Sequence, residues 1–353
     1  MRKTALRLLM MGVGICLGSS SFASNELVVQ SESIGPVIGP DHPDVRASKN
    51  QSGFETGQVL KQDGVYHMFV NEMTPKARLD MRIAHWTSKD SVEWRREGTI
   101  LDSVHGRSST NLRSEVWVTG MAFNEADDCW NMFYVAYRGG DTNKGEKFYS
   151  DYEGIIWRAA SQKKGRAGIG GPYKDMGILM RPDENSQKWE GQQGVDSFFP
   201  YQVGEQWYAL YGSHNHKPWS PWLVGLASAP ALTGPWKRMA TGNPLSLVKV
   251  FTENPVAVRL ADGRWLAIFD SYGDQEIGYS ISADGIVWPP EIRLKVQTGG
   301  NCWTPEGDHA LRTPLGIVTE DDGTFTVLYT AKTRAQSIFY AIGRCKLGWK
   351  SEK

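Results

Sequence analysis

Cysteine is scarce in this chain of 353 residues, and net charge is absent. The four cysteines form no Cys-x-x-Cys motif and no Cys/His cluster, which argues against a zinc site. Lys and Arg number 39, as do Asp and Glu, and this balance argues against a nucleic-acid partner, which needs a basic surface. Beyond the N-terminal segment no stretch approaches about 18 apolar residues, so no membrane-spanning helix is expected.

Helical periodicity of useful length and low-complexity tracts are also missing, whereas aromatic residues are abundant. The chain has 14 Trp and 13 Tyr. Most are expected to fill the interior. Several are expected to line a sugar site, because a flat aromatic ring stacks on the face of a pyranose.

The first residues read as a signal peptide. Arg2, Lys3 and Arg7 precede an apolar run, and Ser21-Phe22-Ala23 is a small-x-small cleavage site. We therefore expect residues 1–23 to be removed and the protein to be periplasmic or extracellular. Cleavage leaves three cysteines, an odd number that gives no disulfide framework. Cys302 could pair with Cys345, or all three could be buried thiols.

A hairpin signal recurs five times along the rest of the chain. Each copy is a polar turn, often Asp-Gly, followed by an aromatic residue and an apolar run that ends in another aromatic. The copies are Asp63–Phe69, Asp128–Phe133, Glu205–Tyr211, Asp262–Phe269 and Asp322–Tyr329. Their lead aromatics are 64, 77, 58 and 60 residues apart. Such a period indicates radial repetition of a four-stranded unit.

The sequence thus predicts an all-β fold, a five-bladed β-propeller with four-stranded antiparallel blades. Residues 51–350 are expected to form this propeller, which would be the catalytic domain. Residues 24–50 are expected to form an N-terminal arm that leads into it. Turns such as Ser282-Ala283-Asp284-Gly285 before Trp288 are typical openings of outer strands in propellers. The longer connections, including residues 212–222 with its His and Trp residues, are candidates for function.

Three acidic residues occupy matching places in the repeat. Glu55 lies 11 residues before Tyr66, Asp196 lies 11 before Trp207, and Glu253 lies 12 before Trp265. Equivalent positions on inner strands point to the same end of a propeller axis, so these carboxyls are expected to converge there. Crowded carboxyls push their pKa values apart, and one can then serve as acid while another serves as base. Glycoside hydrolysis needs this division.

With these motifs the chain resembles the five-bladed propeller glycoside hydrolases of families 43, 117 and 32. Phe251-Thr252-Glu253-Asn254-Pro255 resembles the Glu-x-Pro signature of family 43, and Gly194-Val195-Asp196-Ser197-Phe198 resembles its blade-three Asp motif. The resemblance implies Glu55 as general base, Asp196 as the residue that tunes pKa and orients, and Glu253 as general acid. One departure is that the families usually carry Asp where this chain has Glu55.

Further site candidates come from blade five and from the aromatic residues. By the same resemblance, His309 would act near the leaving group or coordinate an axial cation. The substrate-binding candidates are Arg312, Trp117, His214 and Trp303, and Arg312 could pair with a carboxylate or with an acidic sugar. No cofactor is required, although a structural Ca²⁺ or Na⁺ near the axis stays open.

The predicted function is that of a secreted glycosidase on plant or algal oligosaccharides or polysaccharides, exo-acting and inverting. Two alternatives stay open: a non-catalytic carbohydrate-binding propeller, which would need no acid trio, and a polysaccharide lyase, which would need a Tyr or His base beside an Arg. The sequence leaves the sugar, its linkage, the metal and the oligomeric state open.

Overall fold

The computed structural model is all-β with almost no helix. It describes residues 26–73, 81–103, 112–137, 153–216, 219–247, 251–271, 276–296, 311–333 and 339–350. Its helical segments in that part are α1 (Pro43–Ser48) and the 3-10 turn η2 (Arg166–Gly170). None of the described helices is long and apolar enough to cross a membrane.

The described strands form three four-stranded sheets and one eight-stranded sheet. The first contains β6 (Glu115–Asn124), β7 (Cys129–Tyr137), β8 (Ile155–Ser161) and β9 (Tyr173–Met180). The second contains β10 (Asp196–Val203), β11 (Gln206–His216), β12 (Trp219–Ala229) and β13 (Lys237–Arg238). The third contains β14 (Thr252–Arg259), β15 (Trp265–Ser271), β16 (Glu276–Ser282) and β17 (Ile292–Lys295).

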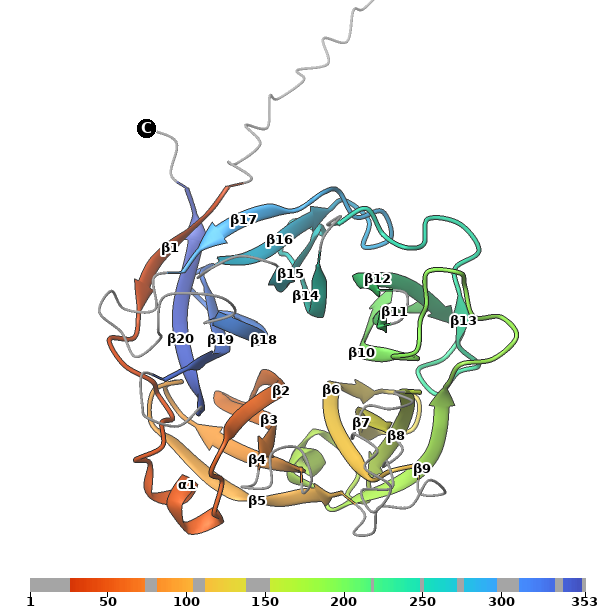
Figure 1. Ribbon diagram of the computed structural model, residues 1–353. Helices are drawn as coiled ribbons and strands as arrows, with labels where there is room; N and C mark the ends of the chain where they lie inside the picture. The colour runs from red at the N-terminus through yellow and green to blue at the C-terminus, as the bar shows by residue number, and fades with distance from the viewer. Residues whose placement is uncertain are drawn as a thin grey trace, which may run out of the picture.

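The eight-stranded sheet joins the two ends of the chain. Its order is β18 (Leu311–Thr319), β19 (Phe325–Lys332), β20 (Tyr340–Trp349), β2 (Gly53–Gln62), β3 (Val65–Met73), β4 (Arg82–Ser88) and β5 (Trp94–Asp102). A single parallel pair, Gly53 with Tyr340, links its two halves. In addition, β1 (Leu27–Glu32) pairs antiparallel with β20, so part of the N-terminal arm supplies a strand beside the C-terminal one (Figure 1).

All five predicted hairpins are present, at the turns that join β2–β3, β6–β7, β10–β11, β14–β15 and β18–β19. The backbone explains the signal at the first one, where Asp63 and Gly64 both have positive φ, 51° and 76°. Asp and Gly are residues that tolerate this conformation, which gives the turn the twist of its strands. An outer turn also forms as expected: Asp284 Oδ1 accepts the backbone N–H groups of Ile286 and Val287, each at 2.8 Å.

The sheets surround a common centre, with β2, β6, β10, β14 and β18 as the innermost strands (Figure 1). Each of these strands contacts the next, and β18 contacts β2. Neighbouring sheets are also tied through aromatic side chains: the Tyr201 hydroxyl of β10 donates to Gly285 O in the turn after β16, at 2.6 Å. The inner strands leave a cavity of only about 10 Å³ between them, about the space for one water.

A stacked histidine pair lies on β3 and β4, away from the inner strands. His67 Nδ1 and His85 Nε2 are 3.0 Å apart, and His85 stacks on Phe69 with centroids 4.6 Å apart. Burial lowers the pKa of His85 to about 4, and His67 lowers it further, against an opposing effect of Glu97. Burial also lowers the pKa of His67, against Glu97 and Asp63.

We expect this pair to make the fold sensitive to acid. Because the folded pKa of His85 lies below its unfolded value, the unfolded chain binds more protons between about pH 6.5 and 4. The stabilisation is complete above pH 6.5 and is lost as the pH falls toward 4, by up to about 3 kcal/mol. Denaturant unfolding should therefore show a smaller loss between pH 7 and 4.5 for His85→Phe than for the parent. Identical losses in the two proteins would contradict this role.

Candidate active site

The site begins with a break in the register of the inner strands. The pairing shifts between Phe54 and Gly57 on β2, between Asp196 and Phe199 on β10, and between Glu253 and Val256 on β14. Similar shifts occur on β6 and β18. A bulge of this kind re-aims side chains and bends the strand. The three predicted acids therefore sit at equivalent bulges.

The residue after two of these acids has left-handed backbone. Ser197 and Asn254 both have φ of 51°. Asn tolerates this conformation better than most residues, and Ser197 is held there by neighbours. Ser197 Oγ lies 3.3 Å from Asn254 Oδ1, and Asn254 Nδ2 donates to Thr313 Oγ1 at 3.3 Å. This polar chain links β10, β14 and β18 beneath the carboxyls and fixes the bulges relative to one another.

Glu55 is held by two donors from other strands. Arg312 Nη2 of β18 lies 3.1 Å from Glu55 Oε1, and Trp117 Nε1 of β6 donates to Glu55 Oε2 at 2.9 Å. Arg312 also lies over the Tyr340 ring at 5.3 Å. Burial alone would lower the pKa of Arg312, but the acidic groups around it, Glu55 above all, outweigh burial and raise that pKa. These two contacts fix the Glu55 carboxyl between β6 and β18.

Asp196 is buried and surrounded by donors. Its Oδ2 accepts the Tyr137 hydroxyl and, at 3.0 Å, the Gln193 side-chain amide, while its Oδ1 accepts the Ser197 backbone N–H. Burial raises the pKa of Asp196, and the charge of Glu55 adds to this, although the three hydrogen bonds oppose it. These hydrogen bonds fix the orientation of the Asp196 carboxyl. A fixed orientation is what a residue needs if it orients other groups and tunes their pKa values.

Glu253 has the environment of an acid. Burial raises its pKa well above the usual range, and the carboxyls of Asp270, Asp196 and Glu55 raise it further, against Arg312. A carboxyl that stays protonated at neutral pH can donate a proton to a leaving group. The raised pKa of Glu253 is the direction that a general acid requires.

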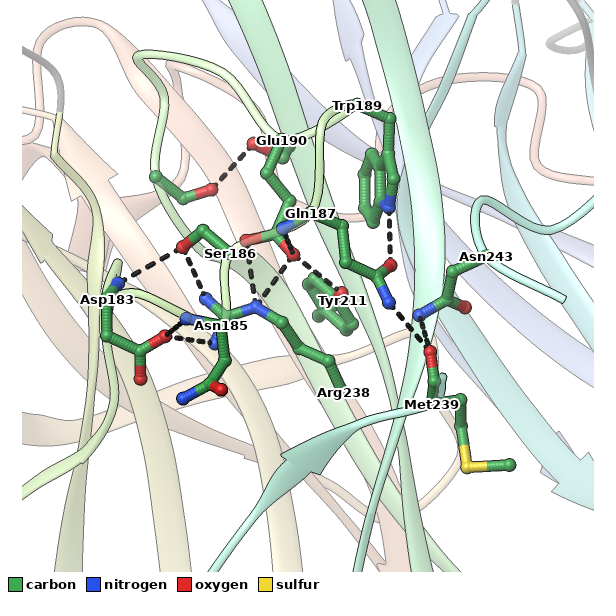
Figure 2. A network of polar contacts seen from close by, with 12 residues as sticks. Asp183, Asn185, Ser186, Gln187, Trp189, Glu190, Tyr211, Arg238, Met239 and Asn243 are labelled. Atoms are coloured by element: carbon green, nitrogen blue, oxygen red, sulfur yellow. Dashed lines mark hydrogen bonds and ion pairs between the residues drawn. The ribbon is translucent and has the colours of Figure 1, made fainter. Parts of the chain in front are cut away.

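Figure 2 shows a second polar network, which holds the loop that precedes Asp196. Arg238 of β13 donates to both carboxylate oxygens of Glu190, at 2.7 and 3.0 Å, and pairs with Asp183 at 3.1 Å. Glu190 also accepts the Tyr211 hydroxyl at 3.0 Å. Arg238 and Glu190 are both buried. The network fastens this loop to β11 and β13.

Hydrogen bonds to β11 also hold the part of this loop that leads directly into Asp196. Ser213 Oγ accepts Gly191 N at 3.1 Å and donates to Gly194 O at 2.7 Å. The Gln193 backbone N–H donates to His214 O at 3.0 Å. These bonds place the Gln193 side chain on Asp196.

Arg238→Met is expected to lower the free energy of unfolding by about 3–5 kcal/mol, because it leaves the buried Glu190 carboxylate without its counter-ion. Urea or guanidinium unfolding measures this. The double variant Arg238→Met/Glu190→Gln should recover part of the loss, since no buried charge is then left. Equal losses in the single and double variants would show that the arginine acts through packing alone.

The structure brings five of the eight predicted site residues to one end of the inner strands: Glu55, Asp196, Glu253, Arg312 and Trp117. His214 lies on β11 beyond Gly212, the register partner of Asp196, and its ring stacks on Trp222 with centroids 5.4 Å apart. Its Nδ1 is 2.6 Å from Ser220 O, so the ring is engaged in its own hairpin. His309 and Trp303 lie outside the described residues, as does Cys302 of the predicted cysteine pair.

Three contributors were not predicted: Tyr137, Gln193 and Asp270. Asp270 pairs in register with Glu253, and Tyr137 pairs with Glu115. Both follow the apolar run of a predicted hairpin strand, so projecting the hairpin register from the turn would have found them. No described group of three or more His, Cys, Asp or Glu side chains gathers to hold a metal ion.

Comparison with solved structures gives many propeller glycoside hydrolases. A family 117 glycoside hydrolase, Zg3597 of Zobellia galactanivorans, superimposes with a TM-score of 0.63 at 12% identity, over 91% of this chain and 90% of that one. The exo-β-1,3-galactanase of Phanerochaete chrysosporium gives 0.55 at 13% identity, over 90% of this chain and 64% of that one. The resemblance to families 117 and 43 is therefore confirmed for the fold, which is a propeller-like all-β fold.

Sequence comparison adds a more distant relation. A 1,2-β-oligomannan phosphorylase of Thermoanaerobacter sp. (strain X514) is 27% identical over 126 residues, which are 34% of this chain. The match spans 38% of the length of that relative. No family model matches the chain.

Proposed function

We propose that the protein is an exported glycosidase built as a five-bladed β-propeller. The fold of its neighbours and the ring of contacts among β2, β6, β10, β14 and β18 support the propeller. The observation that carries the activity is the contrast between two carboxyls at one end of that ring: Glu55 is ion-paired with Arg312, whereas Glu253 is buried and its pKa is raised. Glu253 would protonate the leaving oxygen and Glu55 would activate water, with inversion at the anomeric carbon.

Exo action on a chain end is part of the proposal, and it is supported by the exo-β-1,3-galactanase among the structural neighbours. Plant or algal glycans are the proposed substrates, as the galactanase neighbour acts on a galactan. Export, with Ser24 as the mature N-terminus, is part of the proposal and follows from the signal-peptide pattern.

The test is hydrolysis by purified residues 24–353 on a panel of plant and algal oligosaccharides, followed by ¹H NMR of the first product. Release of single sugars with inverted anomeric configuration supports the proposal. Products with an unsaturated uronic end would indicate a lyase instead. Binding of glycans without turnover across the panel would indicate a binding module.

Phosphorolysis is the second candidate, because part of the chain matches an oligomannan phosphorylase. In that reaction inorganic phosphate replaces water as nucleophile and a sugar 1-phosphate is formed. Arg312, the cation that the described site contains, is already paired with Glu55, which favours hydrolysis. The same assay on β-1,2-linked oligomannan, with and without phosphate, separates the two reactions.

A further inference from the structure

Asp270 is a buried carboxyl that takes no part in the proposed acid–base reaction. It lies near the C-terminal end of β15 and is only 2% exposed. In the antiparallel pairing of β14 with β15 it is directly opposite Glu253. Side chains of directly opposed residues lie on the same face of a sheet, with Cβ atoms about 4.5–5.5 Å apart. The two carboxyls are therefore neighbours by virtue of the backbone alone.

The surroundings of Asp270 give it little compensation. Its register partner on the other side, in β16, is the buried and apolar Ile277. Among the described residues Arg312 is the cation that acts on it, and the carboxylate of Glu55 is 3.1 Å from that guanidinium. Glu55, Glu253 and Asp270 thus share the positive charge of Arg312, and this one guanidinium can balance only one carboxylate. Burial raises the pKa of Asp270 to about 7, against Arg312, so its charge changes near neutral pH.

We propose that Asp270 is a positioning residue that keeps the proton on Glu253. Each negative charge beside a carboxylic acid makes ionisation of that acid less favourable, and a directly opposed carboxylate in a buried site does so strongly. Asp196 on β10 and Glu55 on β2 act on Glu253 in the same direction, and Arg312 on β18 acts against them. Asp270 adds a charge on the neighbouring strand of the same sheet. This inference rests on the proposed role of Glu253 as general acid.

The test is Asp270→Asn, which keeps the shape and removes the charge. A general acid works only while protonated, so activity falls as the pH rises through its pKa. Without the opposed charge Glu253 should lose its proton earlier, and the alkaline limb of kcat/KM should move to lower pH by about one unit. The matched control is Asp262→Asn on the exposed turn of the same β14–β15 hairpin, which should leave the limb in place.

A second readout does not depend on catalysis. Carboxyl ¹³C NMR titration of Glu253 should give a lower pKa in Asp270→Asn than in the parent and the Asp262→Asn control. An unchanged Glu253 pKa overturns the inference, even if the variant is less active. If no glycan is hydrolysed but the Glu253 pKa still falls, the proposed function fails and the coupling stands. Should Asp270→Asn not fold, Asp270→Ser serves in the same titration.

Discussion

Glu253→Gln is expected to lower kcat on an unactivated glycoside by at least about 10²-fold, the scale of lost general-acid catalysis. The amide keeps the size of the side chain but has no proton to give to the leaving oxygen. In the parent protein burial, reinforced by Asp270, Asp196 and Glu55 and opposed by Arg312, raises the pKa of Glu253. The measurement is steady-state turnover of the natural oligosaccharide, with thermal unfolding as a check that the variant folds.

The substrate used decides whether the loss is one of acid catalysis. An aryl glycoside with a good leaving group needs little protonation, so the variant should lose much less activity on it. A uniform loss on both substrates would indicate a disturbed pocket, and full activity on the natural substrate would remove Glu253 from the mechanism. In the parent the same group predicts an alkaline limit to activity: as the pH rises through the raised pKa of Glu253, the acid is lost.

The repeat and the inner-strand acids could be predicted because both are local. Asp63-Gly64 specifies its turn through positive φ, and the apolar run after it specifies the strand. The distance from hairpin to acid then follows from strand length. Glu55, Asp196 and Glu253 were expected at equivalent places on the inner strands; that these places are bulges was not predicted.

What escaped prediction depends on contacts between distant segments. The pairing of Leu27 with Trp349 joins the two ends of the described chain, and no local pattern specifies it. The donors on Asp196 come from β7 and from a loop held by Arg238, and a sequence does not show which loop folds over which strand. Arg312 was expected near a carboxylate or an acidic sugar, but the pairing with Glu55 is a matter of side-chain geometry.

The second large effect is expected from the partner of Arg312 in that ion pair: Glu55→Gln should abolish hydrolysis on every substrate. Water attack has no base in this variant, so a good leaving group does not help, in contrast to Glu253→Gln. Each carboxylate oxygen has two lone pairs, so Glu55 can hold Arg312 and Trp117 and still accept a proton from water. A loss of at least about 10²-fold on both natural and aryl glycosides is the expected result.

Azide separates a lost base from a damaged site. A small anion that needs no deprotonation should restore turnover of the aryl glycoside by Glu55→Gln, and the product should be the inverted glycosyl azide if the parent inverts. Trp117→Phe is the matched control: it removes the N–H that holds Glu55 Oε2 and leaves the carboxylate in place, so it should lower activity moderately and gain nothing from azide. If Glu55→Gln keeps parental activity, Glu55 serves only as the counter-ion of Arg312. Asp196 would then be the next candidate for the base, but its two oxygens already accept three donors, which leaves it little capacity to take a proton from water.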